Sequence, residues 1–199
     1  VKGSMNTYNH QTDVDLNNKY IVFDLGGKEG EDLSLQMYIV LDFVWGRIKE
    51  NKLEKKAVLI DEAWQLIGSH SNVLAAEYVR QIFKTIRAFG GSAFVMTQQV
   101  KDFFALDNGS YGTAIINNAD TKILLHMSPD DCEQMSSIMH LTDSECEKIE
   151  AQKKGCGMIS TGGARLFVKF KSSPFEHEVI TTDPKELRAK LEKQKAERE

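Results

Sequence analysis

The sequence has few cysteines, and it has no long apolar run. Its three cysteines, Cys132, Cys146 and Cys156, are an odd number without a C-x-x-C pair, which argues against a disulfide framework and against a zinc site. The five histidines are too far apart in the sequence to suggest a ligand cluster. No apolar run approaches the ~20 residues that a membrane-spanning helix needs, and no signal peptide is recognisable. We therefore expect a cytoplasmic protein with reduced thiols and no integral membrane segment.

An excess of basic residues is also missing. The chain has 25 Lys and Arg against 29 Asp and Glu, a net charge of −4. This balance does not draw the chain to nucleic acid or to anionic lipid, so any contact with DNA would have to be local. The length of 199 residues and a hydrophobic content of 41% are those of one well-buried domain with at most a small appendage.

An apolar run that ends in two carboxylates is the most informative stretch. Residues Val58–Ile60 favour a parallel strand covered on both faces, and ligands of such sheets bind at the carboxyl ends of the strands. The acids there fit a phosphate-bound Mg²⁺, with Asp61 holding the metal through a water and Glu62 polarising the attacking water. The alternative is that both acids only cap the helix from Ala63, because acidic residues favour helix N-termini.

A second group of polar residues follows the next strand. The apolar run from Ser92 ends in Thr97 and Gln98. A neutral amide at this level can hydrogen-bond a γ-phosphate or its attacking water without adding charge. The alternative is that Thr97 caps a helix and the amide is solvated. Arg87 lies in the last turn of the preceding helix, where a cation is favourable in any case.

The remaining periodicity predicts an α/β protein with a mainly parallel sheet. Further strands are expected at Tyr20–Leu25 and Lys122–Met127. Helices are expected at Glu31–Glu50, from Val73 to a stop at Gly90, at Asp130–Met139 and at Thr142–Gln152. A β-hairpin is expected within Gly157–Phe170, and a charged, solvated helix at Pro184–Glu199.

The phosphate-binding sequence G-x-x-x-x-G-K-[ST] does not occur among the 199 residues. The pair Gly27-Lys28 is followed by Glu29 instead of a hydroxyl residue. We therefore predict a turn at these glycines, not a phosphate cradle.

Several motifs, in order and spacing, resemble the C-terminal part of the conjugation and type IV secretion ATPases of the TraC kind. They are AVLIDEAWQLI, IFKTIRAFGG, FVMTQQVKDFF, AIINNADTKILLHM and GCGMISTGGARLFVKF. The resemblance covers residues 17–183, and these ATPases are relatives of hexameric DNA-pumping motors. It implies a RecA-like P-loop NTPase domain over residues 1–183, a three-layer sandwich that includes the C-terminal hairpin, followed by a charged helical tail over residues 184–199.

The resemblance also implies roles for residues at the strand ends. Asp61 corresponds to the Walker B magnesium residue, which holds the metal through a water, and Glu62 to the catalytic base. Gln98 corresponds to the sensor glutamine, and Thr97 beside it is a candidate nucleotide-binding residue.

Two arginines resemble residues that reach a nucleotide. Arg87 matches a basic position before a glycine in the family and is a candidate to act across a subunit boundary. Arg165 is a weaker candidate of the same sort. For each, the alternative is a surface ion pair or a helix-end charge.

The missing phosphate-binding loop has two expected consequences. In the family this loop precedes the strand at Tyr20, and without it the carboxylates would repel a triphosphate, so the chain alone should neither bind nor hydrolyse ATP appreciably. The strand that carries the loop lies in this fold between the strands that end at Thr97 and at Met127. Its absence should leave a slot or two exposed edges, which invite self-association.

The function that the resemblance implies is that of the C-terminal portion of a motor that hydrolyses ATP with Mg²⁺ and powers substrate transfer or pilus assembly in bacterial conjugation or type IV secretion. It also implies a hexamer, peripheral association with the cytoplasmic face of the membrane, other secretion subunits as partners, and DNA or protein as substrate. One alternative is a non-enzymatic docking module, in which the helices at 130–152 and the charged tail bind a partner. Another is a related DNA translocase or helicase.

Overall fold

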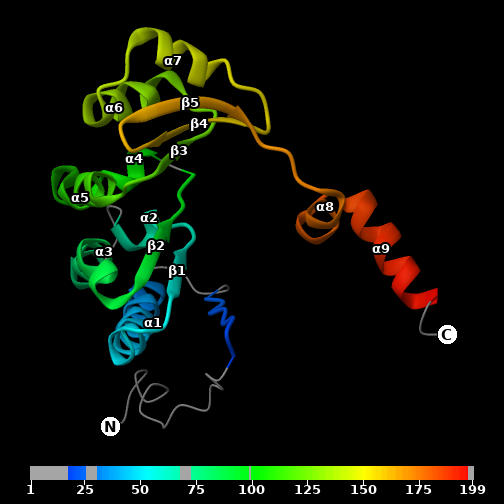
Figure 1. Ribbon diagram of the computed structural model, residues 1–199, viewed down its shortest axis with the longest axis horizontal. Coiled ribbons are helices and arrows are strands. Elements are labelled where there is room, and N and C mark those ends of the chain that lie inside the picture. Colours follow the sequence, from blue (N-terminus) through cyan, green and yellow to red (C-terminus); the bar gives the residue numbers. More distant parts are fainter. Residues whose placement is uncertain (1–17, 26–30, 68–72, 99, 197–199) are drawn as a thin grey trace.

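The computed structural model describes residues 18–25, 31–67, 73–98 and 100–196. Figure 1 shows a body with two stacked parts and an arm at its side. The first part contains a parallel pair of strands, β1 (Lys56–Ile60) and β2 (Gly91–Val95), in a register that places Lys56 opposite Gly91. Of the helices within the described residues, none is long and apolar enough to cross a membrane.

Helices cover one side of the β1–β2 pair. The long helix confirms the sequence prediction in its bounds, and the helix from Val73 changes to a 3-10 turn before the expected stop. These elements are α1 (Glu31–Glu50), α2 (Trp64–Ile67), α3 (Val73–Thr85), η2 (Ile86–Phe89), α4 (Val100–Phe103), η3 (Leu106–Gly109) and α5 (Ser110–Asn118). Their apolar faces form a core whose most buried side chains here include Leu66, Val79, Ile82 and Ile115.

Gly90 ends η2 and starts the turn into β2. Its backbone is left-handed, with φ 72°, and a Cβ there would lie 2.7 Å from the carbonyl oxygen of Lys52. A side chain at this position would therefore be strained in its backbone and would also collide with the loop before β1. The predicted stop at Gly90 is confirmed.

The second part of the body is an antiparallel sheet covered by two helices. Its elements are β3 (Lys122–Leu124), α6 (Pro129–Met139), α7 (Asp143–Glu150), β4 (Cys156–Thr161) and β5 (Ala164–Lys169), with the strands in the order β3-β4-β5. The β4–β5 turn has positive φ at both glycines, 55° at Gly162 and 81° at Gly163, as a two-residue hairpin requires. The predicted hairpin is confirmed, and so is the capping box of Thr142 and Glu145 at the start of α7.

The arm consists of α8 (Pro174–Ile180) and α9 (Pro184–Ala196), which Figure 1 places beside the body at the end of an extended segment. The helix in the tail agrees with the prediction. Helix α8 was not predicted from the sequence, although Ser173 and Glu176 form a capping box around Pro174, a signal of the same type as the one at Thr142.

Three expectations about strands are wrong. Residues 20–25 form neither helix nor strand, and Tyr20 is 83% exposed, because no described strand pairs with this segment. The strand from Lys122 ends at Leu124 instead of Met127. The β1–β2 pair is not covered on both faces, since Leu59 is 62% and Phe94 52% exposed and no described element covers that face.

The strands form two sheets among the described residues, so β2 and β3 are not paired with each other. This agrees with the expectation that the sheet is open between the strand that ends near Thr97 and the strand that starts at Lys122. Each of these two strands has a free edge there within the described part of the chain.

Candidate nucleotide-hydrolysis site

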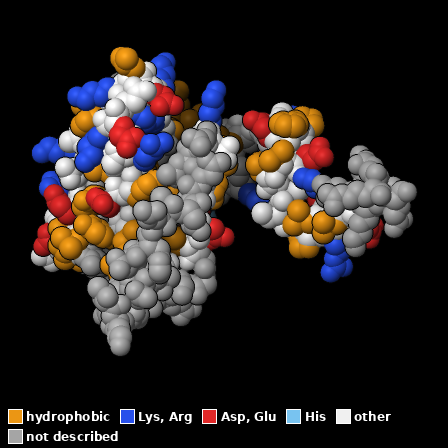
Figure 2. All heavy atoms as spheres, turned by 90° about the horizontal axis from the view of Figure 1, so that it is seen from below, with side chains coloured by type: hydrophobic (Ala, Val, Ile, Leu, Met, Phe, Trp, Pro, Cys, Tyr) orange, Lys and Arg blue, Asp and Glu red, His pale blue; other side chains and the backbone are white. Residues whose placement is uncertain are grey.

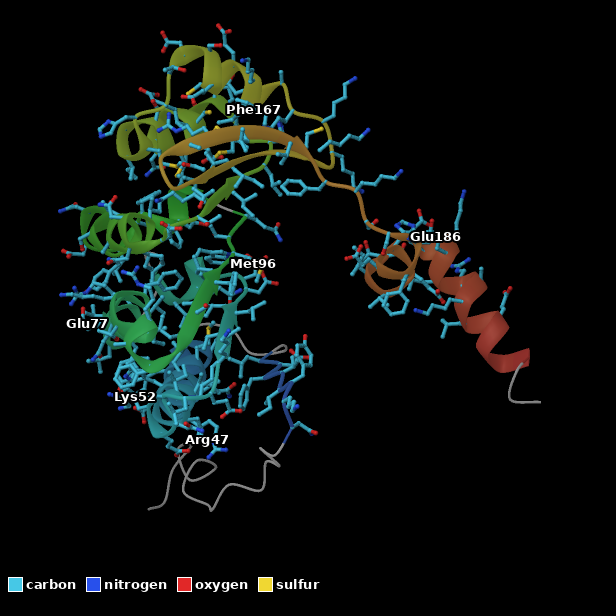
Figure 3. The ribbon with its side chains drawn as sticks, viewed as in Figure 1. Arg47, Lys52, Glu77, Met96, Phe167 and Glu186 are labelled. Carbon is cyan, nitrogen blue, oxygen red and sulfur yellow. The ribbon has the colours of Figure 1, made fainter. Side chains whose placement is uncertain are left out.

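Backbone hydrogen bonds align the carboxyl ends of β1 and β2. The amide of Met96 donates to the carbonyl of Ile60 at 2.9 Å, and the amide of Ala63 donates back to the carbonyl of Met96 at 3.0 Å. Met96, labelled in Figure 3, lies at the end of the parallel pair that faces the second part of the body. The residues that follow the two strands, Glu62 and Gln98, therefore lie side by side.

Glu62 is held between two donors. Gln98 donates its Nε2 to Glu62 Oε1 at 2.7 Å, and the Trp64 indole donates its Nε1 to Glu62 Oε2, also at 2.7 Å. The structure thus joins Glu62 and Gln98, the two residues that were predicted from the sequence as base and sensor. Trp64 was not predicted as part of this site, and the only signal for it is an indole two residues after the glutamate.

The backbone at Glu62 is left-handed, with φ 49°, which is uncommon for a residue other than glycine. The amide of Glu62 donates to Asp61 Oδ1 at 2.9 Å, and this contact supports the turn. Such conformations cost free energy and occur often at functional sites. The turn directs Glu62 toward β2, while Asp61 stays exposed at the strand end.

Asp61 and Thr97 lie where the sequence placed them. Asp61 follows β1, and its second carboxylate oxygen accepts no hydrogen bond from the described residues. Thr97 is half-buried between Met96 and Gln98 at the corresponding end of β2. Both residues therefore border the Glu62–Gln98 contact.

The two candidate arginines are not part of this group. Arg87 belongs to η2, which precedes β2, so the length of the strand separates it from Gln98. Five residues of strand span about 16 Å at ~3.3 Å each. Arg87 is exposed, and its guanidinium has no hydrogen-bond or charged partner among the described residues, whereas its carbonyl accepts from the amide of Gly90 at 3.2 Å.

Arg87 and Arg165 instead line one open groove of about 510 Å³, together with Asp120, Lys122 and the hairpin turn. Arg165 is anchored in it, because its guanidinium donates to Glu145 Oε2 at 2.8 Å, to the carbonyl of His140 at 3.2 Å and to the carbonyl of Met139. It thus holds the C-terminal end of α6. That Lys122 lines this groove was not predicted from the sequence.

Hydrogen bonds lower the pKa of the Glu145 carboxyl. The largest contribution is from the backbone amide of Thr142, and the Thr142 hydroxyl and the charge of Arg165 act in the same direction. Glu145 is therefore the acceptor of the capping box and the partner of Arg165 at once. This arrangement explains Arg165 as a structural residue of the second part of the body.

The fold, with an acid pair at the carboxyl end of a parallel strand, places the chain in the class of P-loop NTPases. The chain belongs to the family of the TraG P-loop domain, whose model matches residues 5–172. A comparison with curated protein sequences finds no match.

Two solved structures show the similarity. VirB4 of Thermoanaerobacter pseudethanolicus superposes with a TM-score of 0.74 at 30% identity, over 82% of this chain and 44% of that chain. The genome packaging NTPase B204 from Sulfolobus turreted icosahedral virus 2, in complex with AMPPCP, has a TM-score of 0.50 at 18% identity, over 66% of this chain and 65% of that chain, which shows the fold alone. The chain spans less than half the length of the VirB4 chain.

Proposed function

We propose that the chain supplies the Walker B and sensor half of an ATPase site in a bacterial conjugation or type IV secretion motor. The observation that carries this proposal is the 2.7 Å hydrogen bond between Gln98 and Glu62, which joins two strands at the end of the sheet where nucleotides bind. The membership in the TraG P-loop family and the similarity to VirB4 support the class of motor.

Some of the residues that would bind a nucleotide and its magnesium ion are present at the site. Asp61 is exposed and has a carboxylate oxygen free to hold Mg²⁺ through a water, and Glu62 is aligned to take a proton from the attacking water. Gln98 reaches the same carboxylate and would orient that water. When bound, the metal neutralises charge on the phosphates. No cluster of three or more metal-ligating side chains occurs among the described residues, so the phosphates themselves would complete the coordination.

Arg87 would contact the phosphates of a nucleotide that the neighbouring subunit binds. In its own subunit the residue lies at the amino end of β2, whereas Glu62 and Gln98 lie at the carboxyl end. An exposed guanidinium without a partner among the described residues is suited to a phosphate that another copy brings. This assignment requires a homo-oligomer, and a hexamer is the form that the sequence resemblance implies. Arg165, which is anchored to α6, would shape the same surface without moving.

The substrate, location and partners of the motor are proposed from the sequence resemblance. The motor would act at the cytoplasmic face of the membrane with other secretion subunits and would transfer DNA or protein or assemble pili. The chain alone would be inactive, because its 199 residues include no G-x-x-x-x-G-K-[ST] loop to hold the β- and γ-phosphates.

The test compares ATP turnover with and without a P-loop segment. The chain is assayed alone and together with, or fused behind, a family segment that carries G-x-x-x-x-G-K-[ST]. We expect turnover only in the second case and expect Glu62→Gln to abolish it, while Glu54→Gln, at an exposed glutamate in the loop before β1, leaves it unchanged. Turnover that survives Glu62→Gln would sink the proposal.

A docking module is the second candidate, and the arm favours it. Phe175 is 75% exposed, and Val179 and Ile180 are exposed on the same helix. Figure 2 shows hydrophobic side chains at the surface of the arm, away from the body. If the arm binds a partner and the sheet is only a scaffold, the reconstituted assembly will show no ATP turnover, and a Phe175→Ser variant will lose the partner.

A further inference from the structure

A second groove, of about 470 Å³, lies between α7 and the β4–β5 hairpin and shares no lining residue with the Arg87 groove. Its lining includes Lys148, Lys153 and Lys169 and no acidic side chain. Although α7 also carries Glu147 and Glu150, neither of them lines the groove. In a chain with a net charge of −4 this is a local concentration of positive charge, which favours an anionic ligand.

An exposed aromatic ring, that of Phe167, lines the same groove and lies beside Lys148. Phe167 stands opposite Met158 in the β4–β5 register, and it shares with Lys169 the strand face toward α7. The ring is 41% exposed on the edge strand of the sheet, and Lys148 Nζ lies 5.4 Å from its centroid. Figure 3 labels Phe167 on β5, below α7. Aromatic rings flanked by cations are the platforms on which proteins stack the bases of single strands.

The groove also contains an amide without a partner. Gln152 lines it, and both Nε2 and Oε1 of this side chain are buried with no hydrogen-bond partner in the described part of the chain. Leaving such a group unpaired costs free energy. A carboxamide offers one donor face and one acceptor, the combination that pairs with the edge of a nucleobase.

From the ring, the amide and the lysines together, we infer that this groove binds a nucleotide unit of a single-stranded nucleic acid. The base lies against Phe167 and reaches Gln152, and the flanking phosphates contact Lys148 and Lys169. An acidic peptide would satisfy the lysines but would leave the ring and the amide unused, and a duplex would keep its bases stacked. The site goes beyond the ATPase proposed above and does not depend on it.

The first test is binding of a fluorescently labelled single-stranded oligodeoxynucleotide to the full chain, measured by anisotropy at low salt. Phe167→Leu keeps an apolar side chain and removes the stacking surface, and we expect it to weaken binding about tenfold. Phe170→Leu is the matched control, because Phe170 is 42% exposed and does not line the groove. It follows β5 directly, three residues after Phe167, and therefore lies on the opposite face of the extended chain. Equal effects of the two substitutions would overturn the inference.

The lysines are tested by the salt dependence of the same binding. Lys148→Gln with Lys169→Gln should lower the slope of log affinity against log salt by ~0.7 for each phosphate that a lysine no longer neutralises. Lys185→Gln with Arg188→Gln removes the same charge from the exposed surface of α9 and should leave the slope unchanged. A slope that falls equally in both double variants would mean that only net charge matters, against a specific site.

Thiol alkylation locates the ligand without any substitution. Cys156 lines the groove, whereas Cys146 is also half-buried and does not line it. We expect the oligonucleotide to slow the alkylation of Cys156 and not that of Cys146. Protection of both thiols, or displacement of the oligonucleotide by polyglutamate or by micromolar AMP, would refute a single-strand site. Unchanged circular dichroism of each variant excludes misfolding as the cause.

Discussion

The second part of the body contains turns and caps made by neighbouring residues, whereas the β1–β2 pair is made only by residues that are distant along the chain. In the second part, the hairpin turn pairs Thr161 with Ala164 and the capping box of α7 joins Thr142 to Glu145, although β3 pairs with the distant β4, Lys122 opposite Ser160. The β1–β2 pair joins Lys56 to Gly91 in parallel, and the Glu62–Gln98 contact depends on that pairing. Local contacts thus form the hairpin and the start of α7, and a distant pairing of strands assembles the Glu62–Gln98 site.

Truncating the core of the second part should have the largest effect. Ile149 of α7 is fully buried, so Ile149→Ala leaves a cavity and should cost about 3 kcal/mol of unfolding free energy. Chemical denaturation measures this loss. A cost below that of a typical surface substitution, about 0.5 kcal/mol, would show that this part does not carry the stability that its local contacts indicate.

Substitutions of Arg165 and Arg87, the two arginines that line the first groove, should differ in their effects on stability and on ATP turnover. Arg165→Gln removes the bonds to Glu145 and to the end of α6 and should cost about 1–2 kcal/mol, given that the pair is partly exposed. Arg87→Gln should change the unfolding free energy by less than about 0.5 kcal/mol, because the guanidinium of Arg87 is exposed and has no partner among the described residues. In the reconstituted ATPase the order should reverse, with Arg87→Gln as the more harmful change to turnover. Equal stability losses would contradict the division of roles.

Because the pKa of Glu145 is lowered, the second part of the body should lose stability at acid pH. A carboxyl whose pKa is lower in the folded state stabilises the fold above its unfolded pKa of about 4.3, and this contribution is lost as the pH falls through the folded value. Wild-type protein should therefore lose more stability between about pH 5 and pH 3 than Glu145→Gln does. Denaturant midpoints of both proteins across this range give the comparison.

The exposed face of the β1–β2 pair should affect association more than stability. Leu59→Ser with Phe94→Ser removes two largely exposed side chains, so the unfolding free energy should change by less than about 1 kcal/mol. Light scattering should show less self-association, because an apolar face beside a free strand edge favours pairing of copies. Leu53→Ser is the control, since Leu53 is exposed in the loop before β1. A wild-type chain that stays monomeric at high concentration would remove the basis for this prediction.

The sequence was sufficient where neighbouring residues decide the structure. The Gly162-Gly163 turn, the Thr142 capping box and the stop at Gly90 each depend on a few adjacent side chains, and all three are confirmed. The carboxyl ends of parallel strands meet at one edge, so the pairing of Glu62 with Gln98 could also be inferred.

The remaining features depend on contacts that no local pattern encodes. The apolar run at Tyr20 has the composition of a strand, but a strand also needs a partner, and none is present among the described residues. Arg165 follows the hairpin turn in sequence, and only the tertiary fold brings it to the carbonyls of Met139 and His140 at the end of α6. The groove with Gln152 likewise combines a helix end with a strand far along the chain.

The two hydrogen bonds of the Glu62 carboxylate have a mechanical consequence. One oxygen is tied to Trp64 in its own segment and the other to Gln98 beyond the neighbouring strand. A ligand that pulls the Gln98 amide toward itself would release one oxygen of Glu62 while the indole keeps hold of the other. The carboxylate would then turn about that remaining contact, so its orientation at the end of β1 would follow directly from what Gln98 touches.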